Sequence, residues 1–179
     1  VEHVSPWGAS TTYRYIGRTV EITGPGGAGT RIEKDPLGRP VRITDPEGGV
    51  TSYTYGPFSH LRTVTDPNGA VTTFERDAFG RLRKHIDPNR GTTTAHYNGF
   101  GQRTSVTDAA GRSFAYTYDP GSRLIKRTDK EGAETATTSW TWDTAPMGIG
   151  QLAEVASPDG NKVIYEYDPY GQPQTTRRE

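Results

Sequence analysis

The sequence predicts an all-β fold, a row of tandem antiparallel β-hairpins that repeat every 21 residues and form one curved strip. Three observations support this prediction. Two turn signals recur at a constant step of 21 residues, strand-like runs of five or six residues separate them, and no segment has the apolar spacing of an amphipathic helix. Short strands joined by four-residue turns form a meander.

The first turn signal has the form Asp-x-x-Gly, and Arg follows it in several copies. Its last position recurs at Gly17, Gly38, Ser59, Gly80, Gly101 and Ser122. Asp at the first position accepts local backbone hydrogen bonds, and Gly at the fourth takes the left-handed conformation that leads back into a strand. Each of these segments is therefore expected to be a tight turn.

The second turn signal has the form Asp-Pro-x-Gly. Its series reads Gly24-Pro25, Asp45-Pro46, Asp66-Pro67, Asp87-Pro88, Asp108-Ala109 and Asp129-Lys130. The register then slips once by seven residues, three of them within 133–139 and four within 143–150, before the period resumes at Ser157. Both insertions are expected to lie in connections, and the segment 143–151 is expected to be an extended hairpin loop.

The runs between the turns carry aromatic and β-branched residues in register. They include Thr51–Tyr55, Leu61–Thr65, Phe114–Tyr118 and Val163–Tyr167. Stacking the repeats gives a column that reads Thr11, Ile32, Tyr53, Phe74, Ala95, Tyr116, Trp140 and Tyr165. The partner strand carries Ile22, Ile43, Val64, His85, Val106, Arg127, Val155 and Thr176. Such cross-strand pairs contribute roughly 0.2–1 kcal/mol each, and about eight repeats fill residues 1–179 as a single array.

The composition agrees with a strip that lacks a thick core. Only 31% of residues are hydrophobic, while ten Tyr, three Trp and five Phe argue against disorder. The 21 basic and 21 acidic side chains are not clustered, so nucleic acid is not an expected partner. No apolar run is long enough for a membrane span, and the chain contains no Cys for disulfides or thiolate metal sites.

No residue pattern indicates catalysis, a metal or a cofactor, and the chain is not expected to be an enzyme. The aspartates fall at turn positions, where capping explains them: Asp35, Asp45, Asp66, Asp77, Asp87, Asp108, Asp119, Asp129, Asp143, Asp159 and Asp168. His3, His60, His85 and His96 lack metal-ligand spacing. The Gly-rich segment 24–29 lacks the Lys that a phosphate loop requires.

Two sets of residues are candidates for a binding surface. The arginines that follow the first turn are Arg18, Arg39, Arg81 and Arg123. Their stems are expected to cover apolar surface and their guanidinium groups to pair with turn acids. The second set is a possible surface for a ligand or partner and consists of Trp140, Trp142, Met147, Tyr116 and Tyr118.

Two segments carry a resemblance to a known family. Tyr116–Leu124 and Tyr165–Pro173 resemble the Tyr-Asp-x-x-Gly-Arg-Leu motif of the YD-repeat (Rhs) family, and Asp77–Leu82 matches it without the aromatic residue. The resemblance implies a long β-strip that spirals into a hollow shell. In bacterial Rhs proteins and insecticidal toxin complexes such a shell encloses a C-terminal toxin, and in teneurin-like relatives it serves adhesion.

The resemblance thus implies a scaffold that encapsulates a toxin or other cargo in a secreted or cell-surface bacterial protein. No shell-closing motif or toxin segment is present, so the chain is expected to be part of a longer protein. Its partners would be the remaining repeats and the enclosed toxin. The alternative is a carbohydrate- or protein-binding adhesion module, with a glycan as the possible ligand. Two unpaired end strands would also permit an edge-strand oligomer.

Overall fold

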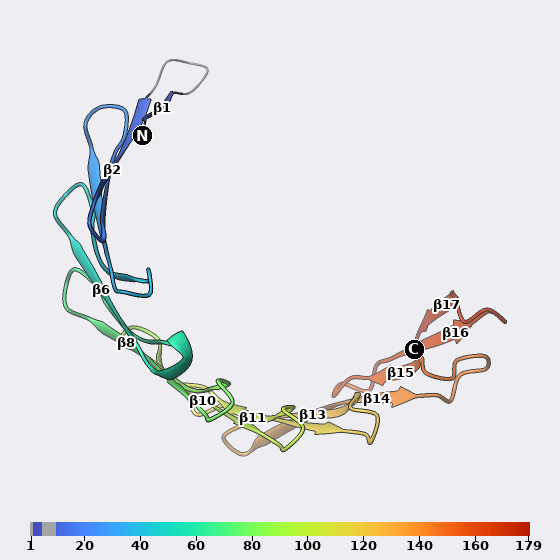
Figure 1. The fold of residues 1–179 in the computed structure, drawn as a ribbon. Helices are drawn as coiled ribbons and strands as arrows, with labels where there is room; N and C mark the ends of the chain where they lie inside the picture. Colours follow the sequence, from blue (N-terminus) through green and yellow to red (C-terminus); the bar gives the residue numbers. More distant parts are fainter. Residues whose placement is uncertain (1, 5–9) are drawn as a thin grey trace. The chain divides into compact units, whose positions relative to one another are not determined.

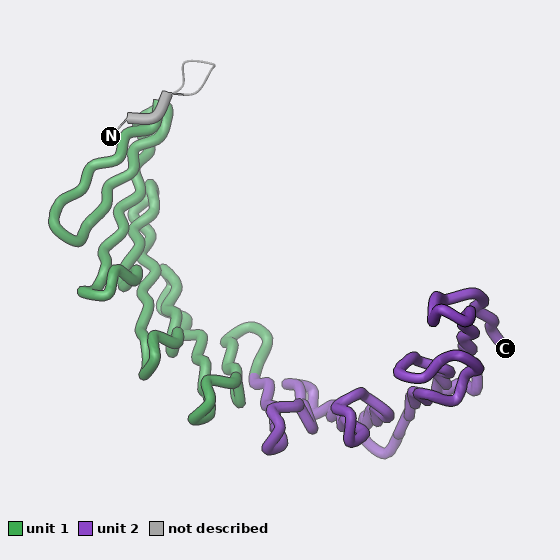
Figure 2. The backbone as a smooth tube through the Cα atoms, turned by 45° about the vertical axis from the view of Figure 1, so that its right-hand side comes forward, with its two compact units in different colours: residues 1–91 green, residues 92–179 purple. Residues whose placement is uncertain are grey.

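The computed structural model describes residues 2–4 and 10–179, with side chains from residue 10 onward. The parts of the predicted array at residues 1 and 5–9, and the side chain of His3, lie outside the described residues. The chain divides into two compact units, residues 1–91 and 92–179 (Figure 2). All regular elements of the described part are strands, apart from the short 3-10 turn η1 at Pro57–Ser59.

The first unit is a meander of antiparallel strands (Figure 1). Strand β1 pairs with β2, and from β2 to β9 each strand pairs with the next along the chain. Their bounds are β1 Glu2–Val4, β2 Ser10–Ile16, β3 Thr19–Thr23, β4 Gly29–Lys34, β5 Pro40–Thr44, β6 Val50–Tyr55, β7 Leu61–Thr65, β8 Val71–Arg76 and β9 Leu82–Asp87.

The second unit repeats this plan, with consecutive antiparallel pairing from β10 to β17. Its strands are β10 Gly91–Tyr97, β11 Arg103–Thr107, β12 Ser113–Tyr118, β13 Leu124–Glu131, β14 Glu134–Trp142, β15 Leu152–Ala156, β16 Lys162–Tyr167 and β17 Pro173–Arg178. The predicted all-β class is confirmed, and each of the four predicted runs lies within one residue of an observed strand.

Both turn signals fold into the same five-residue turn. At Asp35, the backbone N–H donates to the carbonyl of Arg39 (2.9 Å), and the N–H of Gly38 donates to the carbonyl of Asp35 (3.0 Å). Gly38 has a φ of +80°, the left-handed conformation that the signal requires. We call the turns at 35–39, 56–60, 77–81, 98–102, 119–123 and 168–172 the YD turns. Those at 24–28, 45–49, 66–70, 108–112 and 157–161 are the DP turns.

The predicted cross-strand ladder is confirmed in seven of its eight copies, for example as Tyr53 opposite Val64 and Trp140 opposite Val155. The first copy is wrong, because Ile22 lies opposite Tyr13 and not Thr11. Gly17 and Arg18 form a two-residue turn there, with Ile16 paired to Thr19. Position 14 holds Arg where Asp35, Asp77 and Asp119 cap the later turns, so a five-residue turn here would lack its carboxylate cap.

The prediction that Asp129 caps a turn is also wrong. Asp129 lies inside β13, opposite Ala136, and the hairpin closes at residues 132–133 beyond Glu131 and Glu134. Gly132, with a φ of +58°, permits this tighter turn. The extra residues within 133–139 therefore lengthen β13 and β14 and do not form a loop.

Each unit is a single layer whose two faces differ in chemistry. The ladder face carries side chains such as Ile43, Tyr53 and Val64, while the opposite face carries ion pairs such as Glu75 with Lys84. Among the described residues, Val20 and Ala153 are the only buried hydrophobic ones. No second layer covers the ladder face of either unit, so neighbouring hairpins have to hold one another in place.

Candidate functional site

The aspartate of a YD turn is bound by its own turn. In the turn at Asp35, Oδ1 accepts the backbone N–H groups of Leu37 (2.9 Å) and Arg39 (3.0 Å), and Oδ2 accepts Nε of Arg39 at 2.7 Å. The same side-chain pairing joins Asp77 to Arg81 and Asp119 to Arg123 in two other YD turns, and Asp108 to Arg112 in a DP turn. The predicted capping role therefore holds for these aspartates, as does the predicted pairing of Arg39, Arg81 and Arg123 with turn acids.

Hydrogen bonds from arginine lower the pKa of these carboxyl groups. The Arg39 side chain holds the pKa of Asp35 below its usual value. Desolvation raises the pKa of Asp77, but hydrogen bonds from Arg81 and Phe79 outweigh it, and the net shift is downward. Exposed ion pairs of this kind contribute little to stability by themselves, so their main effect is to fix the position of the guanidinium group.

The longest loop of the described part is anchored by a carboxylate that Arg123 binds twice. The two terminal guanidinium nitrogens of Arg123 donate to Asp143 at 2.9 and 2.6 Å, and the N–H of Gly150 donates to Asp143 at 2.7 Å. Together these bonds lower the pKa of Asp143 to about 2. The segment 143–151 is therefore an ordered loop between β14 and β15. Gly148 is buried in it, and a Cβ there would lie 3.0 Å from Tyr167.

The aromatic residue before a YD turn reaches back one repeat. The hydroxyl of Tyr55 donates to the carbonyl of Pro40 at 2.7 Å, directly after the preceding YD turn. Tyr118 and Tyr167 bind the equivalent carbonyls of Arg103 and Leu152, at 2.9 and 2.7 Å. These bonds, which we call the inter-repeat staples, attach each of these strands to the end of the turn before it.

A tryptophan makes the same staple where the tyrosine is missing. The indole Nε1 of Trp142 donates to the carbonyl of Leu124 at 2.9 Å, and the guanidinium of Arg123 lies 5.1 Å from the ring centre. Arg39 lies 4.3 Å from the ring of Tyr55 in the same way. An aspartate thus holds an arginine, which stacks on the aromatic ring of the following repeat.

The YD turn at 56–60 departs furthest from this arrangement. The turn 56–60 has Gly56 in place of Asp and His60 in place of Arg, and Arg76 takes the place of the stapling tyrosine. Phe58 and Ser59 both have positive φ, at 57° and 62°. A hollow of about 560 Å³ lies beside this turn.

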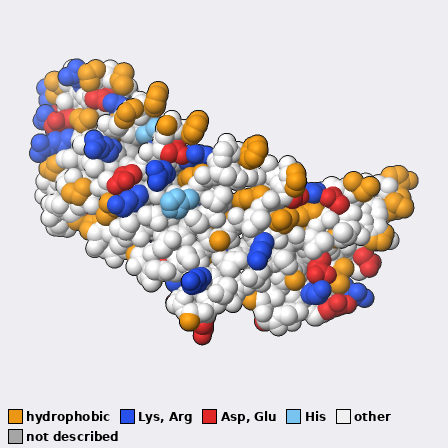
Figure 3. Space-filling model, turned by 90° about the horizontal axis from the view of Figure 1, so that it is seen from below, with side chains coloured by type: hydrophobic (Ala, Val, Ile, Leu, Met, Phe, Trp, Pro, Cys, Tyr) orange, Lys and Arg blue, Asp and Glu red, His pale blue; other side chains and the backbone are white. Residues whose placement is uncertain are grey.

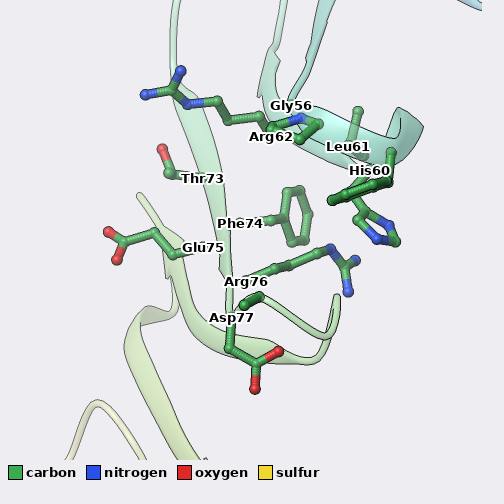
Figure 4. A pocket seen from close by; sticks show the side chains of 12 residues that line it. Gly56, His60, Leu61, Arg62, Thr73, Phe74, Glu75, Arg76 and Asp77 are labelled. Atoms are coloured by element: carbon green, nitrogen blue, oxygen red, sulfur yellow. The ribbon is translucent and has the colours of Figure 1, made fainter.

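Aromatic and basic groups line this hollow (Figure 4). Phe74 points into it and stacks on His85, with 4.9 Å between ring centres. His60 and Arg76 lie beside Phe74, whereas Arg62 and Glu75 extend away (Figure 4). His60 rests on Gly80, where a Cβ would lie 2.6 Å from Nε2, and Arg76 donates to the carbonyl of Gly80. The hollow can accept an apolar side chain against Phe74.

An equivalent hollow of about 590 Å³ lies two repeats later, in the second unit. Its lining includes Phe100, Tyr116 and Tyr118. Each hollow lies between two successive YD turns on the ladder face. Hollows of this kind thus occur in both units.

The five predicted surface residues lie in two places. Tyr116 and Tyr118 line the second hollow, whereas Trp140, Trp142 and Met147 lie on β14 and the loop that follows it. The polar atoms of Tyr118 and Trp142 bind backbone carbonyls, so these side chains hold the strip together. Trp140 is half-buried opposite Val155, and Met147 is exposed.

No group of three or more His, Asp or Glu side chains among residues 10–179 is placed to hold a metal ion. In the same part of the chain, no helix is long and apolar enough to cross a membrane. His60 and His85 pack on Gly80 and Phe74, which gives both a structural role. The turn-bearing rim, with its capped turns and staples, is the candidate functional site.

The pH dependence of stability tests the anchoring of the loop. An aspartate with a folded pKa near 2 and an unfolded value near 3.9 stabilises the fold above about pH 4 and loses that effect as pH falls toward 2. We expect Asp143→Asn to lower the melting temperature at pH 7 and to weaken its decline below pH 4. Circular dichroism melts from pH 7 to 2 measure both quantities. Glu47→Gln is the charge control, and equal acid slopes for Asp143→Asn and the parent chain would contradict the anchor.

Removal of one staple hydroxyl tests the link between repeats. Tyr55→Phe leaves the carbonyl of Pro40 without that donor, and we expect a loss of about 1 kcal/mol in the free energy of unfolding. Tyr170→Phe is the matched control, because Tyr170 is 88% exposed at the tip of a turn. Urea denaturation followed by circular dichroism measures both variants. Equal midpoints would show that the staple contributes nothing.

Comparison with known proteins places these features in a family. The sequence profile of the RHS repeat matches residues 35–69, 57–92 and 97–135. No curated protein sequence matches the chain.

Solved structures share the fold at low sequence identity. The TcdB2-TccC3 structure superposes with a TM-score of 0.69 at 12% identity, over 100% of this chain and 14% of that chain. The Tc holotoxin pore of Photorhabdus luminescens gives a TM-score of 0.64 at 13% identity, with the same coverage of both chains. The chain thus spans about one seventh of the length of these matched chains. Because the matching profile covers more than half of the chain, the chain belongs to the RHS repeat family.

Proposed function

We propose that the chain is a segment of the wall of a β-shell, a passive scaffold that encloses a toxin or other cargo in a secreted or cell-surface bacterial protein. The observation that carries the proposal is the single-layer sheet with one aromatic and aliphatic face and almost no buried core. Such a sheet separates two compartments but builds no catalytic pocket of its own. Family membership and the fold shared with TcdB2-TccC3 support the same role.

In this proposal the wall is held together by local bonds. Carboxylate-capped turns fix the ends of the strands, and the staples fix each hairpin to its neighbour. The partners of this segment are then the remaining repeats of the parent protein and the enclosed cargo. The segment acts by exclusion, because a continuous hydrogen-bonded sheet keeps the enclosed cargo away from proteases and from binding partners in solution.

Small-angle scattering coupled to size-exclusion chromatography tests the open strip. A compact globule of 179 residues has a radius of gyration of about 16 Å. We expect a clearly larger value, either from an open monomer or from an oligomer joined through unpaired edge strands. A monomer near 16 Å would mean that the repeats close on themselves, and the wall proposal would fail.

The second candidate is a carbohydrate- or protein-binding module. The hollows favour it, because each offers an aromatic floor and polar neighbours, such as Tyr116 beside Asn98 and Gln102. Against it, Arg39 and Arg123 already cover the rings of Tyr55 and Trp142 that a sugar would stack on.

Glycan titration separates the two candidates. A wall segment gives no saturable binding of neutral oligosaccharides in isothermal calorimetry, and we expect that result. Saturable binding that Tyr116→Ala or Trp140→Ala abolishes, while Tyr170→Ala leaves it unchanged, would establish the binding module. Tyr116 and Trp140 are half-buried, whereas Tyr170 is exposed. The melting temperatures of the three variants therefore serve as the control for general destabilisation.

A further inference from the structure

The position directly before a YD turn holds a tyrosine in most copies of the repeat. Tyrosine occupies it before four of the six YD turns, as Tyr55, Tyr97, Tyr118 and Tyr167. In each inter-repeat staple described above, the polar hydrogen of the ring binds the carbonyl of the residue that follows the preceding turn. The repeat thus forms a site for an aromatic ring that carries a hydrogen-bond donor, and the chain's own side chain occupies that site.

The hollow beside the turn 56–60, which we call the first hollow, has no ring at this position. Arg76 stands there, and its side chain donates to the carbonyl of Gly80 in the following turn at 3.0 Å. The carbonyl equivalent to the staple acceptors is that of Leu61, which lines the first hollow. No side chain among residues 10–179 donates to this carbonyl. The pairing of β7 with β8 begins at Thr63 opposite Thr73, so Leu61 lies beyond that ladder.

The hollow two repeats later, the second hollow, shows the same position with its ring. Tyr118 stands there in place of Arg76, and its hydroxyl binds the carbonyl of Arg103 at 2.9 Å. The guanidinium of Arg103 lies 5.3 Å from the centre of the Tyr116 ring, which forms part of the lining. The second hollow therefore has its acceptor and its ring already engaged, although the volumes of the two hollows are similar.

The first hollow also carries positive charge that no acid of the chain balances. Its acidic lining residues, Glu75 and Asp77, each form an ion pair with a basic residue outside the lining. Arg62 and Arg76 line the hollow as well, and neither forms an ion pair with a carboxylate of residues 10–179. In the space-filling view, some basic side chains likewise stand apart from acidic ones (Figure 3). A guanidinium group binds a carboxylate more strongly than a neutral acceptor.

We propose that the first hollow binds a tyrosine side chain of another polypeptide, in which an acidic residue is next to that tyrosine. The tyrosine hydroxyl donates to the carbonyl of Leu61, its ring packs against Phe74, and the neighbouring carboxylate pairs with Arg76. The bound side chain thus supplies from outside the staple that this repeat lacks. The inference requires only the hairpins from β6 to β9 and does not depend on the wall proposal.

The size of the contact determines its strength. A tyrosine side chain buries roughly 150–250 Å², well below the roughly 800 Å² per partner of a stable protein complex. One ring, one hydrogen bond and one ion pair therefore give a dissociation constant on the order of 1 mM. A contact of this strength is reversible and selects a short sequence feature of its partner.

NMR titration of the full isotope-labelled chain with matched peptides tests the site. The peptide Gly-Tyr-Glu-Gly with blocked ends should shift the amide signals of His60 and Leu61 and saturate on the order of 1 mM. Gly-Phe-Glu-Gly lacks the hydroxyl and Gly-Tyr-Gln-Gly lacks the charge, so each should bind at least about fivefold more weakly. The amides of Gln102 and Thr104 in the second hollow are the internal control and should not shift.

Three outcomes of the titration would overturn the inference. Equal affinity for the three peptides would mean a contact without recognition of the hydroxyl or the charge. Equal shifts at both hollows would mean that Arg76 and the carbonyl of Leu61 play no part. The absence of saturation below about 10 mM would remove the site altogether. The scattering result does not change in any of these cases, so failure of this site is distinguishable from failure of the wall proposal.

Variants at position 76 test the same site from the side of the protein. Arg76→Tyr supplies the ring from within, so peptide binding should fall at least about tenfold without a lower melting temperature. Arg76→Gln removes the charge, and this variant should bind the Tyr-Glu and Tyr-Gln peptides equally. Lys126→Gln, at an exposed position of the second unit, is the charge control and should bind like the parent chain.

Unchanged peptide binding in Arg76→Tyr would overturn the proposal, as would a retained preference for the acidic peptide in Arg76→Gln. The peptide series and Arg76→Gln introduce no new ring into the hollow. They therefore decide the matter even where Arg76→Tyr lowers the melting temperature.

Discussion

The structure depends on the hydrogen bonds that a turn carboxylate accepts from its own backbone. Asp35 orders the four residues that follow it, sets the exit direction of β5 and positions Arg39. Arg39 in turn lies on Tyr55, whose hydroxyl binds the carbonyl of Pro40. The Asp35 side chain thus defines its own turn and, through Arg39 and Tyr55, also fixes the position of the next hairpin. In a sheet without a buried core, this chain of polar contacts replaces the packing that joins layers in ordinary domains.

The exceptions show what the carboxylate does. At Gly56 it is absent, and Phe58 takes a positive φ of 57° at a position where no other five-residue turn of the described part has a non-glycine residue with positive φ. At position 14 it is also absent, and the chain takes a shorter turn that shifts the hairpin register by two residues. At Asp143 the carboxylate is present, but the loop that it closes is four residues longer than a YD turn. There Asp143 still closes the loop through the backbone of Gln151 and gains Arg123 as an additional partner.

Much of this architecture is readable from the sequence, because turns and ladders are encoded by residue type and spacing. The 21-residue step locates the four strand-like runs of the sequence to within about one residue, and it places Tyr53 opposite Val64 and Trp140 opposite Val155. The register of the first hairpin and the place of Asp129 are not readable in this way, because two-residue turns compete locally with the longer ones. The inter-repeat staples cannot be predicted from the sequence for another reason. Their acceptors are backbone carbonyls, which any residue supplies.

The staples have a further consequence for how such a chain acquires its structure. Tyr118 and Tyr167 bind carbonyls 15 residues earlier, and the side-chain hydrogen bonds between Arg123 and Asp143 span 20 residues. All-β domains usually fold slowly because their strands pair across long stretches of sequence. Here each repeat pairs with the repeat directly before it, so pairing can occur as soon as the repeat has been synthesised. A chain of any number of such repeats can therefore order itself progressively from the ribosome, without waiting for its C-terminal part.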